Sequence, residues 1–321
     1  MNIFMIIFII IIIIILLILT FIHYKINLFR YIYINSNYTN ILEDKLKNYY
    51  KKEKALSNKV VISLTTIPTR INTLYKTIYS LLDQTHRVDE IIINIPYVSL
   101  KGVNYNIPFW LKKCTNYKFI KLNRCEDIGP ITKIVPTINM YKNQNVNIIV
   151  VDDDTIYKSN IINLLCKNYT KYNCAISATG YTFFNINRSK RIYNKLEYNM
   201  KHVDILMGYN GYIVNSLFFK DDWDTFRLSN KLFFYVDDDC ISLYLNKQNI
   251  NIYAFSKMEG CSLPQFNHLI EWFFYKESDS LSRTHNKSIS SSKLFGKNEE
   301  MILKQFGYYL TDYSFISWLI N

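Results

Sequence analysis

The chain has 321 residues, 49% of them hydrophobic, which is enough for one large α/β domain or two small ones with a packed core. Its net charge of +12 suits a phosphorylated ligand or an anionic membrane face. The basic residues form no dense Lys/Arg block, which argues against a nucleic-acid partner. The six cysteines show no Cys-x-x-Cys spacing, so neither a zinc ribbon nor a redox motif is expected, while disulfides and buried thiols both stay open.

An apolar run from Ile3 to Ile22, interrupted only by Thr20, lies at the start of the sequence. Its length is that of a helix that crosses a bilayer. The run has no basic start and no small-residue cleavage site, which favours an uncleaved single-pass anchor over a signal peptide. The basic residues that follow it favour a cytosolic catalytic domain. Asn-x-Ser/Thr sequons, usable in a lumenal domain, leave the side of the membrane open.

Three regions are predicted: an anchor over 1–22, a stem over 23–58 with partial helix around 41–54, and one folded domain over 59–321. Within the domain, strands are predicted at 60–64, 91–95, 119–122, 148–151 and 175–178, and helices at 71–82, 131–141 and 160–169. This alternation predicts an α/β fold with a mainly parallel sheet and helices on both faces. In such sheets, ligands bind beyond the carboxyl ends of the strands.

Three consecutive carboxylates, Asp152, Asp153 and Asp154, follow the strand predicted at 148–151. On an extended backbone, Asp152 and Asp154 point to one side and Asp153 to the other. Two carboxylates on one side are stable when a hard cation lies between them, and oxygen ligands favour Mg²⁺ or Mn²⁺ over zinc. The alternative is an acidic surface turn.

Two other predicted strand ends carry polar motifs. The first strand runs into Thr65-Thr66-Ile67-Pro68-Thr69-Arg70, which places hydroxyls, backbone donors and a guanidinium where a nucleotide could bind. A capped helix start with a solvent-facing Arg70 is the alternative. After the third strand, Asp127-Ile128-Gly129-Pro130-Ile131-Thr132-Lys133 leads into a helix, so that Lys133 could face a phosphate or a sugar. An ordinary turn explains the Gly-Pro pair as well.

A second acidic triplet, Asp237-Asp238-Asp239, opens a helical segment after the apolar residues 233–236. A carboxylate at a helix N-terminus is kept ionised by the helix dipole and the free amide donors. Capping is an alternative role for Asp237, but three carboxylates exceed what capping needs.

These motifs, in this order, resemble the nucleotide-diphospho-sugar glycosyltransferases of the GT-A fold, which is Rossmann-like, and in particular family-2-like enzymes of bacterial polysaccharide pathways and large DNA viruses. The resemblance covers about Lys59 to Ala254 and includes a Gly-Tyr-Asn-Gly loop at Gly208 to Gly211, which would line the acceptor and donor-sugar side. It implies that the nucleotide sugar is contacted by Thr66, Arg70, Asp127, Lys133, Asp152 and Asp153. It also implies that a Mn²⁺ or Mg²⁺ ion is held by Asp152, Asp154 and His285.

The resemblance further implies that Asp238, paired with Asp237, is the base that deprotonates the acceptor in an inverting reaction. His268 competes with His285 as the metal ligand, and a surface histidine on the Ser/basic loop at 278–292 is the alternative for His285. Polymerising members carry a Gln-x-x-Arg-Trp motif followed by membrane helices. Here Gln265 and Trp272 have a different spacing, and no second span follows, which favours the transfer of single sugars.

The sequence therefore predicts a membrane-anchored, metal-dependent glycosyltransferase that moves one sugar from a nucleotide-diphosphate sugar to a hydroxyl of a glycan, protein or lipid. Two alternatives stay open. The same carboxylates could serve a metal-dependent nucleotidyl or phosphoryl transferase, or the chain could be a non-catalytic, membrane-tethered glycan-binding protein.

Overall fold

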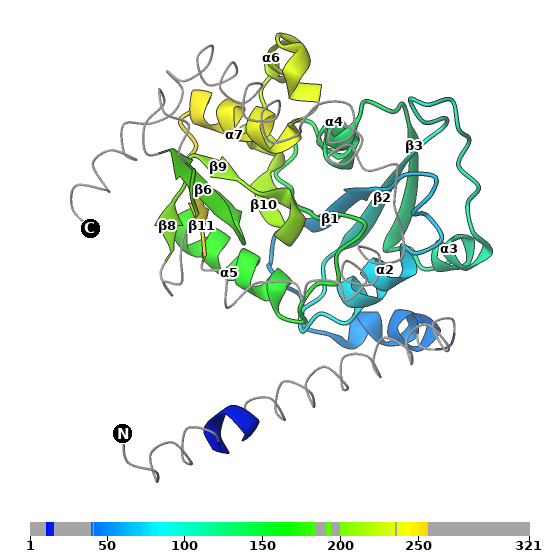
Figure 1. Cartoon of the computed structure of the whole chain (residues 1–321). Helices are drawn as coiled ribbons and strands as arrows, with labels where there is room; N and C mark the ends of the chain where they lie inside the picture. The colour runs from blue at the N-terminus through cyan, green and yellow to red at the C-terminus, as the bar shows by residue number, and fades with distance from the viewer. Residues whose placement is uncertain are drawn as a thin grey trace.

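A computed structural model describes residues 11–15, 40, 42–183, 191–193, 200–234 and 236–255 (Figure 1). Its centre is an eight-stranded sheet with the strand order β3-β2-β1-β4-β10-β5-β11-β8. The strands, in that order, are Ile120–Cys125, Glu90–Pro96, Val60–Thr65, Asn147–Val150, Tyr212–Asn215, Ala175–Ser177, Ile252–Ala254 and Lys201–His202. A three-stranded sheet has the order β7-β6-β9, with β7 at Arg191–Tyr193, β6 at Gly180–Phe183 and β9 at Ile205–Leu206.

The large sheet is mostly parallel, as the sequence predicts. Strand β1 is parallel to β2 and β4, β2 is parallel to β3, and β5 is parallel to β11. Strand β10 was not predicted, and it runs antiparallel between β4 and β5. The edge strand β8 is antiparallel to β11. The four parallel strands β3, β2, β1 and β4 therefore direct their carboxyl ends toward one side of the molecule.

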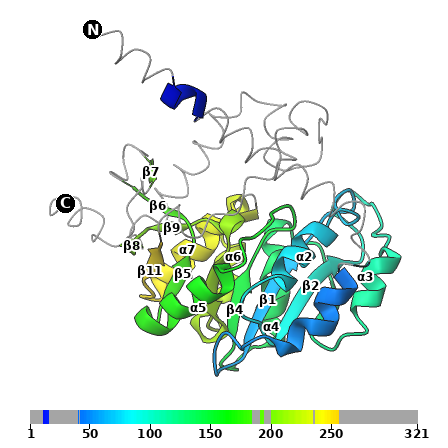
Figure 2. The ribbon, with the colours of Figure 1, turned by 90° about the horizontal axis from the view of Figure 1, so that it is seen from below.

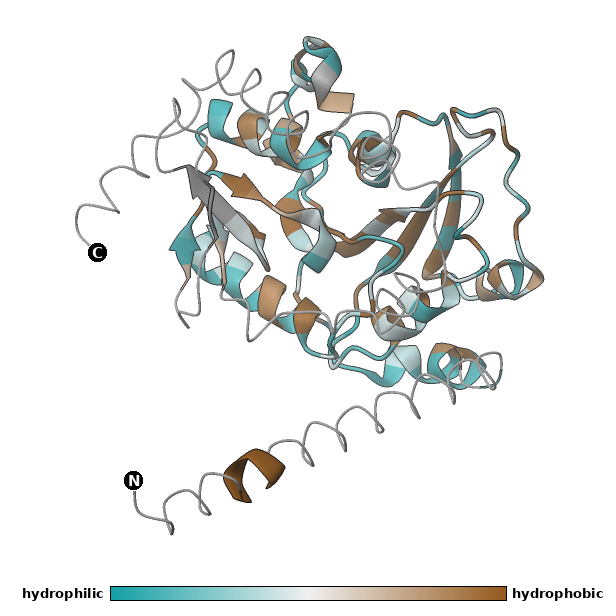
Figure 3. Ribbon diagram, in the orientation of Figure 1, coloured by the Kyte–Doolittle hydropathy of each residue, from teal (hydrophilic) through white to brown (hydrophobic). Residues whose placement is uncertain are grey.

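Helices cover both faces of the sheet (Figure 2). The helices are α2 (Tyr75–Leu82), α3 (Phe109–Cys114), α4 (Val135–Met140), α5 (Ile161–Tyr172), α6 (Trp223–Leu228) and α7 (Asp237–Lys247). Along β1, Val60, Ile62 and Leu64 pack with α2, α3 and α5, whereas Val61 faces α4, α6 and α7. The central strands are accordingly hydrophobic, while the helices alternate between hydrophobic and hydrophilic positions (Figure 3).

Short 3₁₀ turns connect several elements: η1 (Tyr49–Lys51), η2 (Pro130–Lys133), η3 (Gly208–Asn210), η4 (Ser216–Phe218) and η5 (Lys231–Phe234). The helix predicted over 131–141 is divided into η2 and α4. Pro136 lies in the first turn of α4 and has no N–H to donate to the preceding turn, so the hydrogen-bond ladder restarts there. Lys133 consequently ends a short turn rather than lying inside a longer helix.

Part of the predicted stem belongs to the folded core. Residues 42–48 are helical, and Leu42, Leu46 and Tyr49 are buried. The Tyr49 ring stacks on Phe119 with 4.3 Å between the ring centroids, and its hydroxyl accepts a hydrogen bond from Val88 N at 2.9 Å. The apolar core therefore begins before Lys59, where the domain was predicted to start.

Among the residues that the structure describes, no helix is long and apolar enough to span a bilayer. Of the apolar run from Ile3 to Ile22, the described part is 11–15, which is helical and exposed. The predicted loop at 278–292, with His285, and the residues Gln265, His268 and Trp272 lie outside the described residues.

Candidate active site

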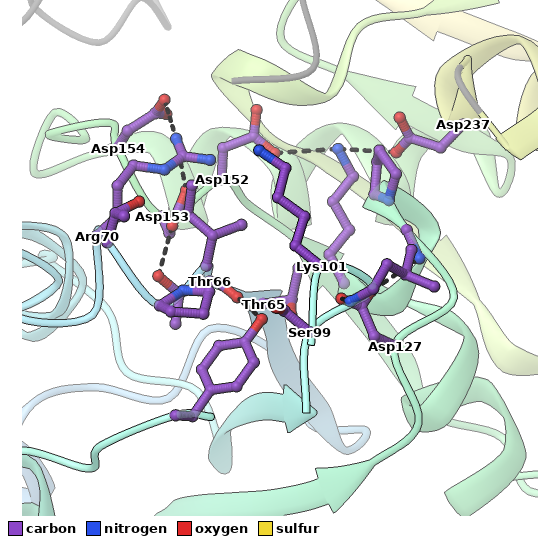
Figure 4. A pocket seen from close by; sticks show the side chains of 18 of the residues that line it. Thr65, Thr66, Arg70, Ser99, Lys101, Asp127, Asp152, Asp153, Asp154 and Asp237 are labelled. Carbon is purple, nitrogen blue, oxygen red and sulfur yellow. Dashed lines mark hydrogen bonds and ion pairs between the residues drawn. The ribbon is translucent and has the colours of Figure 1, made fainter. Parts of the chain in front are cut away.

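A cavity of about 620 Å³ opens beyond the carboxyl ends of β1 and β4 (Figure 4). The residues predicted to act in catalysis, nucleotide contact or metal binding all line it where the structure describes them: Thr66, Arg70, Asp127, Lys133, Asp152, Asp153, Asp154, Asp237 and Asp238. These residues come from four separate segments, which the parallel strands and the start of α7 bring to one place. The predicted metal ligand His285 lies outside the described residues.

Asp153 and Arg70 form the first charged cluster. The Arg70 Nη1 atom lies 3.0 Å from Asp153 Oδ1 and also pairs with the Asp154 carboxylate. The Thr66 hydroxyl donates a hydrogen bond to Asp153 Oδ2 at 2.6 Å. Burial raises the pKa of Asp153 to about 6, although the Arg70 guanidinium opposes the shift. Both oxygens of the Asp153 carboxylate are therefore already paired with groups of the protein itself.

The backbone of the triplet is held by two hydroxyls. The Thr77 hydroxyl of α2 donates to the Asp153 carbonyl at 2.7 Å, and the Tyr157 hydroxyl accepts from Asp152 N at 2.8 Å. Strand β4 ends at Val150, and residues 153–154 lie in a turn. Within this turn the Asp153 side chain is 6% exposed, whereas those of Asp152 and Asp154 are 27% and 36% exposed. Asp152 and Asp154 are thus the two carboxylates available to a ligand.

Lys133 joins the two acidic triplets. Its Nζ atom lies 3.0 Å from Asp152 Oδ1 and 2.8 Å from Asp237 Oδ2. Burial alone would lower the pKa of Lys133, but the carboxylates of Asp152, Asp237 and Asp238 outweigh it and raise the pKa well above its ordinary value. The Lys133 side chain therefore stays charged, with acidic neighbours on two sides.

Asp238 lies beside this cation without pairing to it directly. Its Oδ2 atom accepts a hydrogen bond from Gly208 N at 3.0 Å, and its Oδ1 atom has no hydrogen-bond partner within the described ranges. Burial and the neighbouring Asp237 raise the pKa of Asp238 to about 7, against the opposing effects of Lys133 and the Gly208 amide. A carboxyl group with this pKa can take up a proton near neutral pH.

The Gly-Tyr-Asn-Gly loop approaches these groups because Gly208 has no side chain. A Cβ atom at Gly208 would lie 2.8 Å from Asp238 Oδ1 and 2.9 Å from Lys133 Nζ. Both distances are shorter than normal contacts. Glycine at this position therefore lets the backbone amide reach Asp238.

Asp127 lines the cavity, but both of its carboxylate oxygens accept backbone hydrogen bonds. Oδ1 accepts from Gly129 N at 3.0 Å, and Oδ2 accepts from Leu100 N at 2.9 Å. Asp127 therefore ties the turn before η2 to the loop that carries Leu100 and Lys101. In Figure 4 the Lys101 side chain extends from this loop toward Asp152.

Several lining residues were missed by the sequence reasoning, among them Lys101, Tyr105 and Phe234. The Tyr105 hydroxyl donates to the Thr66 carbonyl at 3.0 Å and so supports the loop after β1. Tyr209, which also lines the cavity, belongs to the Gly208–Gly211 loop that was predicted to line the acceptor and donor-sugar side. Lys101 and Tyr105 lie in an irregular segment whose path toward the cavity no periodic pattern indicates.

The carboxylates fit a divalent cation only in part. No group of three or more His, Cys, Asp or Glu side chains that could hold a metal is present in the described part of the chain. Asp152 and Asp154 offer partly exposed oxygens, which Mg²⁺ and Mn²⁺ prefer. An ion bound there would have two protein ligands from these residues and would take the others from a ligand such as a diphosphate, which is a usual arrangement for Mg²⁺.

No protein-family profile matches the chain, and no curated protein matches its sequence. Among solved structures, GalNAc-T7 with UDP, GalNAc and Mn²⁺ matches with a TM-score of 0.43 and 12% identity over 79% of this chain. Two structures of S. aureus TarS 1–349 match with a TM-score of 0.40 over 62% of this chain, one at 11% identity and the other, in complex with UDP, at 13% identity. The match spans 58% of each of these solved chains. A likeness this distant does not extend to substrate or mechanism, so function has to follow from the cavity itself.

Proposed function

We propose that this chain is a GT-A-type glycosyltransferase that moves a single sugar from a nucleotide-diphosphate sugar to a hydroxyl acceptor. The observation that carries the proposal is the arrangement around Lys133. A buried ammonium group that can neutralise a diphosphate lies beside Asp238, a carboxyl group whose pKa of about 7 suits a general base.

On the donor side, the nucleotide binds against the loop after β1, near Thr66 and Arg70. Asp127 holds the neighbouring loop in place, so that Lys101 and Lys133 face the diphosphate. As the bond between the anomeric carbon and the diphosphate oxygen breaks, its electron pair leaves with the nucleoside diphosphate. The Lys133 ammonium neutralises the charge that develops there, and such electrostatic assistance is usually a large part of catalysis.

On the acceptor side, the Asp238 carboxylate is the group proposed to take up the proton of the acceptor hydroxyl. As the acceptor oxygen bonds to the anomeric carbon, its proton passes to Asp238. Attack from the face opposite the leaving diphosphate inverts the anomeric configuration. Asp237, which pairs with Lys133 at 2.8 Å, holds the cation beside the base.

Mn²⁺ or Mg²⁺ is proposed to bind Asp152 and Asp154, with His285 as a candidate further ligand. When bound, the ion supplies additional charge neutralisation for the nucleoside diphosphate. Asp153 contributes by holding Arg70 and the loop after β1, through the contacts with Arg70 Nη1 and the Thr66 hydroxyl.

The apolar run from Ile3 to Ile22 is proposed to anchor the enzyme in a membrane as a single N-terminal helix. Carbonate extraction should leave the full chain in the membrane fraction, because peripheral proteins are released by this treatment and a spanning helix is not. Protease protection of intact vesicles would then decide the side of the membrane. Recovery of a mature chain that begins after Ile22 would identify a signal peptide instead.

The proposed reaction can be tested with the purified full chain, Mn²⁺ and labelled UDP-, GDP- or CDP-sugars. We expect transfer of the sugar and release of free nucleoside diphosphate, after a thermal-shift screen has identified the donor through its stabilising effect. Transfer of the nucleotide to the acceptor would identify a nucleotidyltransferase. Glycan binding without turnover of any donor would identify a binding protein.

A further inference from the structure

The position of the Lys133 ammonium is narrowly determined. Its Nζ atom lies within hydrogen-bonding distance of Asp152 on one side and Asp237 on the other, and a Cβ atom at Gly208 would approach it to 2.9 Å. Lys133 is also the last residue of η2, a turn of four residues. So short a turn has few hydrogen bonds of its own, and the position of its last residue has to be fixed from outside.

A buried polar network supplies this support at the Lys133 carbonyl. The Ser63 hydroxyl of β1 donates to Lys133 O at 2.5 Å and lies 2.6 Å from the Thr137 hydroxyl of α4. The Asn94 side chain of β2 donates from Nδ2 to both hydroxyl oxygens, at 3.1 Å each. Its Oδ1 accepts from Asn123 Nδ2 of β3 at 2.8 Å.

The centre of the network is Asn94, which interrupts the apolar sequence of β2. Ser63, Asn94 and Thr137 are each 0% exposed. A buried amide in a sheet of Ile and Val side chains loses its hydration, and the hydrogen bonds largely compensate for that loss without adding much net stability. A fully satisfied buried network does fix one arrangement of the groups that it joins. Here those groups are three neighbouring strands, α4 and the carbonyl of Lys133.

We propose that Asn94 is a positioning residue that, through Ser63 and Thr137, holds Lys133 between the two acidic triplets. This inference deepens the proposed function, on which the role of Lys133 rests. Loss of the Asn94 amide would remove the bonds that hold the Ser63 and Thr137 hydroxyls together and leave Ser63 free to turn away from the Lys133 carbonyl, and η2 would shift together with its lysine. A displacement of about 1 Å near reacting groups can lower turnover by about 100-fold.

Asn94→Leu keeps the size of the side chain and removes its hydrogen bonds. Asn215 offers a matched control, because its buried amide donates to Asn145 and Asn147 at 2.7 and 2.8 Å at the amino end of β4, away from the cavity. Thermal unfolding and turnover should be measured on both variants in the full chain. We expect similar losses of stability, a loss of turnover of about tenfold or more in Asn94→Leu and little change in Asn215→Leu. Equal turnover in the two variants would overturn the proposal.

Two further variants separate positioning from general destabilisation. Thr137→Ser keeps the hydroxyl and should retain turnover. Thr137→Val removes the hydroxyl, and its turnover should fall as in Asn94→Leu. In a Lys133→Met background, Asn94→Leu should lower turnover no further, because residues that act through one group are not additive. Additive losses would show that Asn94 acts independently of Lys133 and would also overturn the proposal.

A crystal structure of the Asn94→Leu chain gives a readout that does not depend on activity. We expect the Lys133 Nζ atom to have left hydrogen-bonding distance of Asp152 or Asp237. An unchanged Lys133 would contradict the proposal even if sugar transfer is confirmed. A displaced lysine in a chain without sugar transfer would support the positioning role and refute the proposed function.

Discussion

Replacing Asp238 with asparagine should change stability and turnover in opposite directions. In the folded chain, burial and Asp237 raise the pKa of the Asp238 carboxyl from its ordinary 3.8 to about 7. A raised folded pKa means that the folded state favours the protonated carboxyl. The contribution of this group to stability is therefore fully present below pH 4 and is lost as the pH rises through about 7.

The size of the effect follows from the pKa difference. At about 1.4 kcal/mol per pKa unit, ionising Asp238 in the folded chain costs on the order of 4 kcal/mol more than in the unfolded chain. An asparagine cannot ionise, and its oxygen can still accept the hydrogen bond from Gly208 N. Asp238→Asn should therefore be more stable than the unchanged protein at pH 8 by about 2 kcal/mol or more, and the difference should disappear toward pH 4.

Turnover should show the opposite dependence on pH, because a general base must be ionised before it can accept a proton. In the unchanged protein, turnover should rise with pH and level off above about 7. Asp238→Asn should lower turnover by about 100- to 10,000-fold while donor affinity stays nearly unchanged. Product NMR should show inverted anomeric configuration.

The assay combines denaturant unfolding from pH 4.5 to 8.5 with turnover over the same range. Asp221→Asn is a suitable control, because the Asp221 side chain is 91% exposed and lies outside the cavity. Lower stability of Asp238→Asn at pH 8, or a turnover of the unchanged protein that already levels off near pH 4, would refute the reasoning. Retained anomeric configuration would remove Asp238 from its role as the base.

Three other changes have clear expected outcomes. Asp154→Asn should keep the fold but abolish Mn²⁺-dependent donor binding in calorimetry, because one charged oxygen ligand is lost; equal losses of melting temperature and binding would instead mark the triplet as structural. Gly208→Ala should lower turnover at least tenfold with little unfolding, since the new methyl group would displace Asp238 or Lys133 from its present position. Removal of residues 1–58 should lower the free energy of unfolding in denaturant by at least about 3 to 5 kcal/mol, the loss typical for a buried aromatic side chain such as Tyr49. Removal of 1–39 should leave the free energy of unfolding nearly unchanged in the same measurement.

The alternation of strands and helices could be predicted because apolar periodicity is a local property of the sequence. The parallel strands β1, β2 and β4 lie where it indicated. The pattern gave no sign of β10, a strand of four residues, Tyr212–Asn215. Its insertion between β4 and β5 depends on partners far away in the sequence. The core contribution of Leu42, Leu46 and Tyr49 was missed for the same reason, because it depends on contacts with residues far away in the sequence, such as those of Tyr49 with Val88 and Phe119.

The types of side chain that line the cavity could be predicted from the sequence. Which of these side chains pair with each other could not. Polar motifs indicated where charges would gather, and each of these motifs in the described residues contributes side chains to one cavity. Which cation neutralises which carboxylate depends on side-chain reach in three dimensions, so neither the contact of Arg70 with Asp153 nor that of Lys133 with Asp237 follows from spacing. Asn94 did carry a sequence signal, a lone amide within an apolar strand, whose meaning depended on the position of Ser63.

The charge balance of the cavity indicates how metal and donor would bind together. Arg70 pairs with Asp154 and Lys133 pairs with Asp152, so each proposed metal ligand is already neutralised by a protein cation. A divalent ion alone would have to compete with these cations, whereas a diphosphate can draw them away and free both carboxylates. Nucleotide and Mn²⁺ should therefore strengthen each other's binding, and by linkage the two enhancements must be equal.

Calorimetry should find weak Mn²⁺ binding to the full chain alone and at least tenfold tighter binding with UDP or the preferred nucleoside diphosphate present, a coupling of about 1.4 kcal/mol. Equal Mn²⁺ affinity in both conditions would show that the protein cations do not compete with the ion.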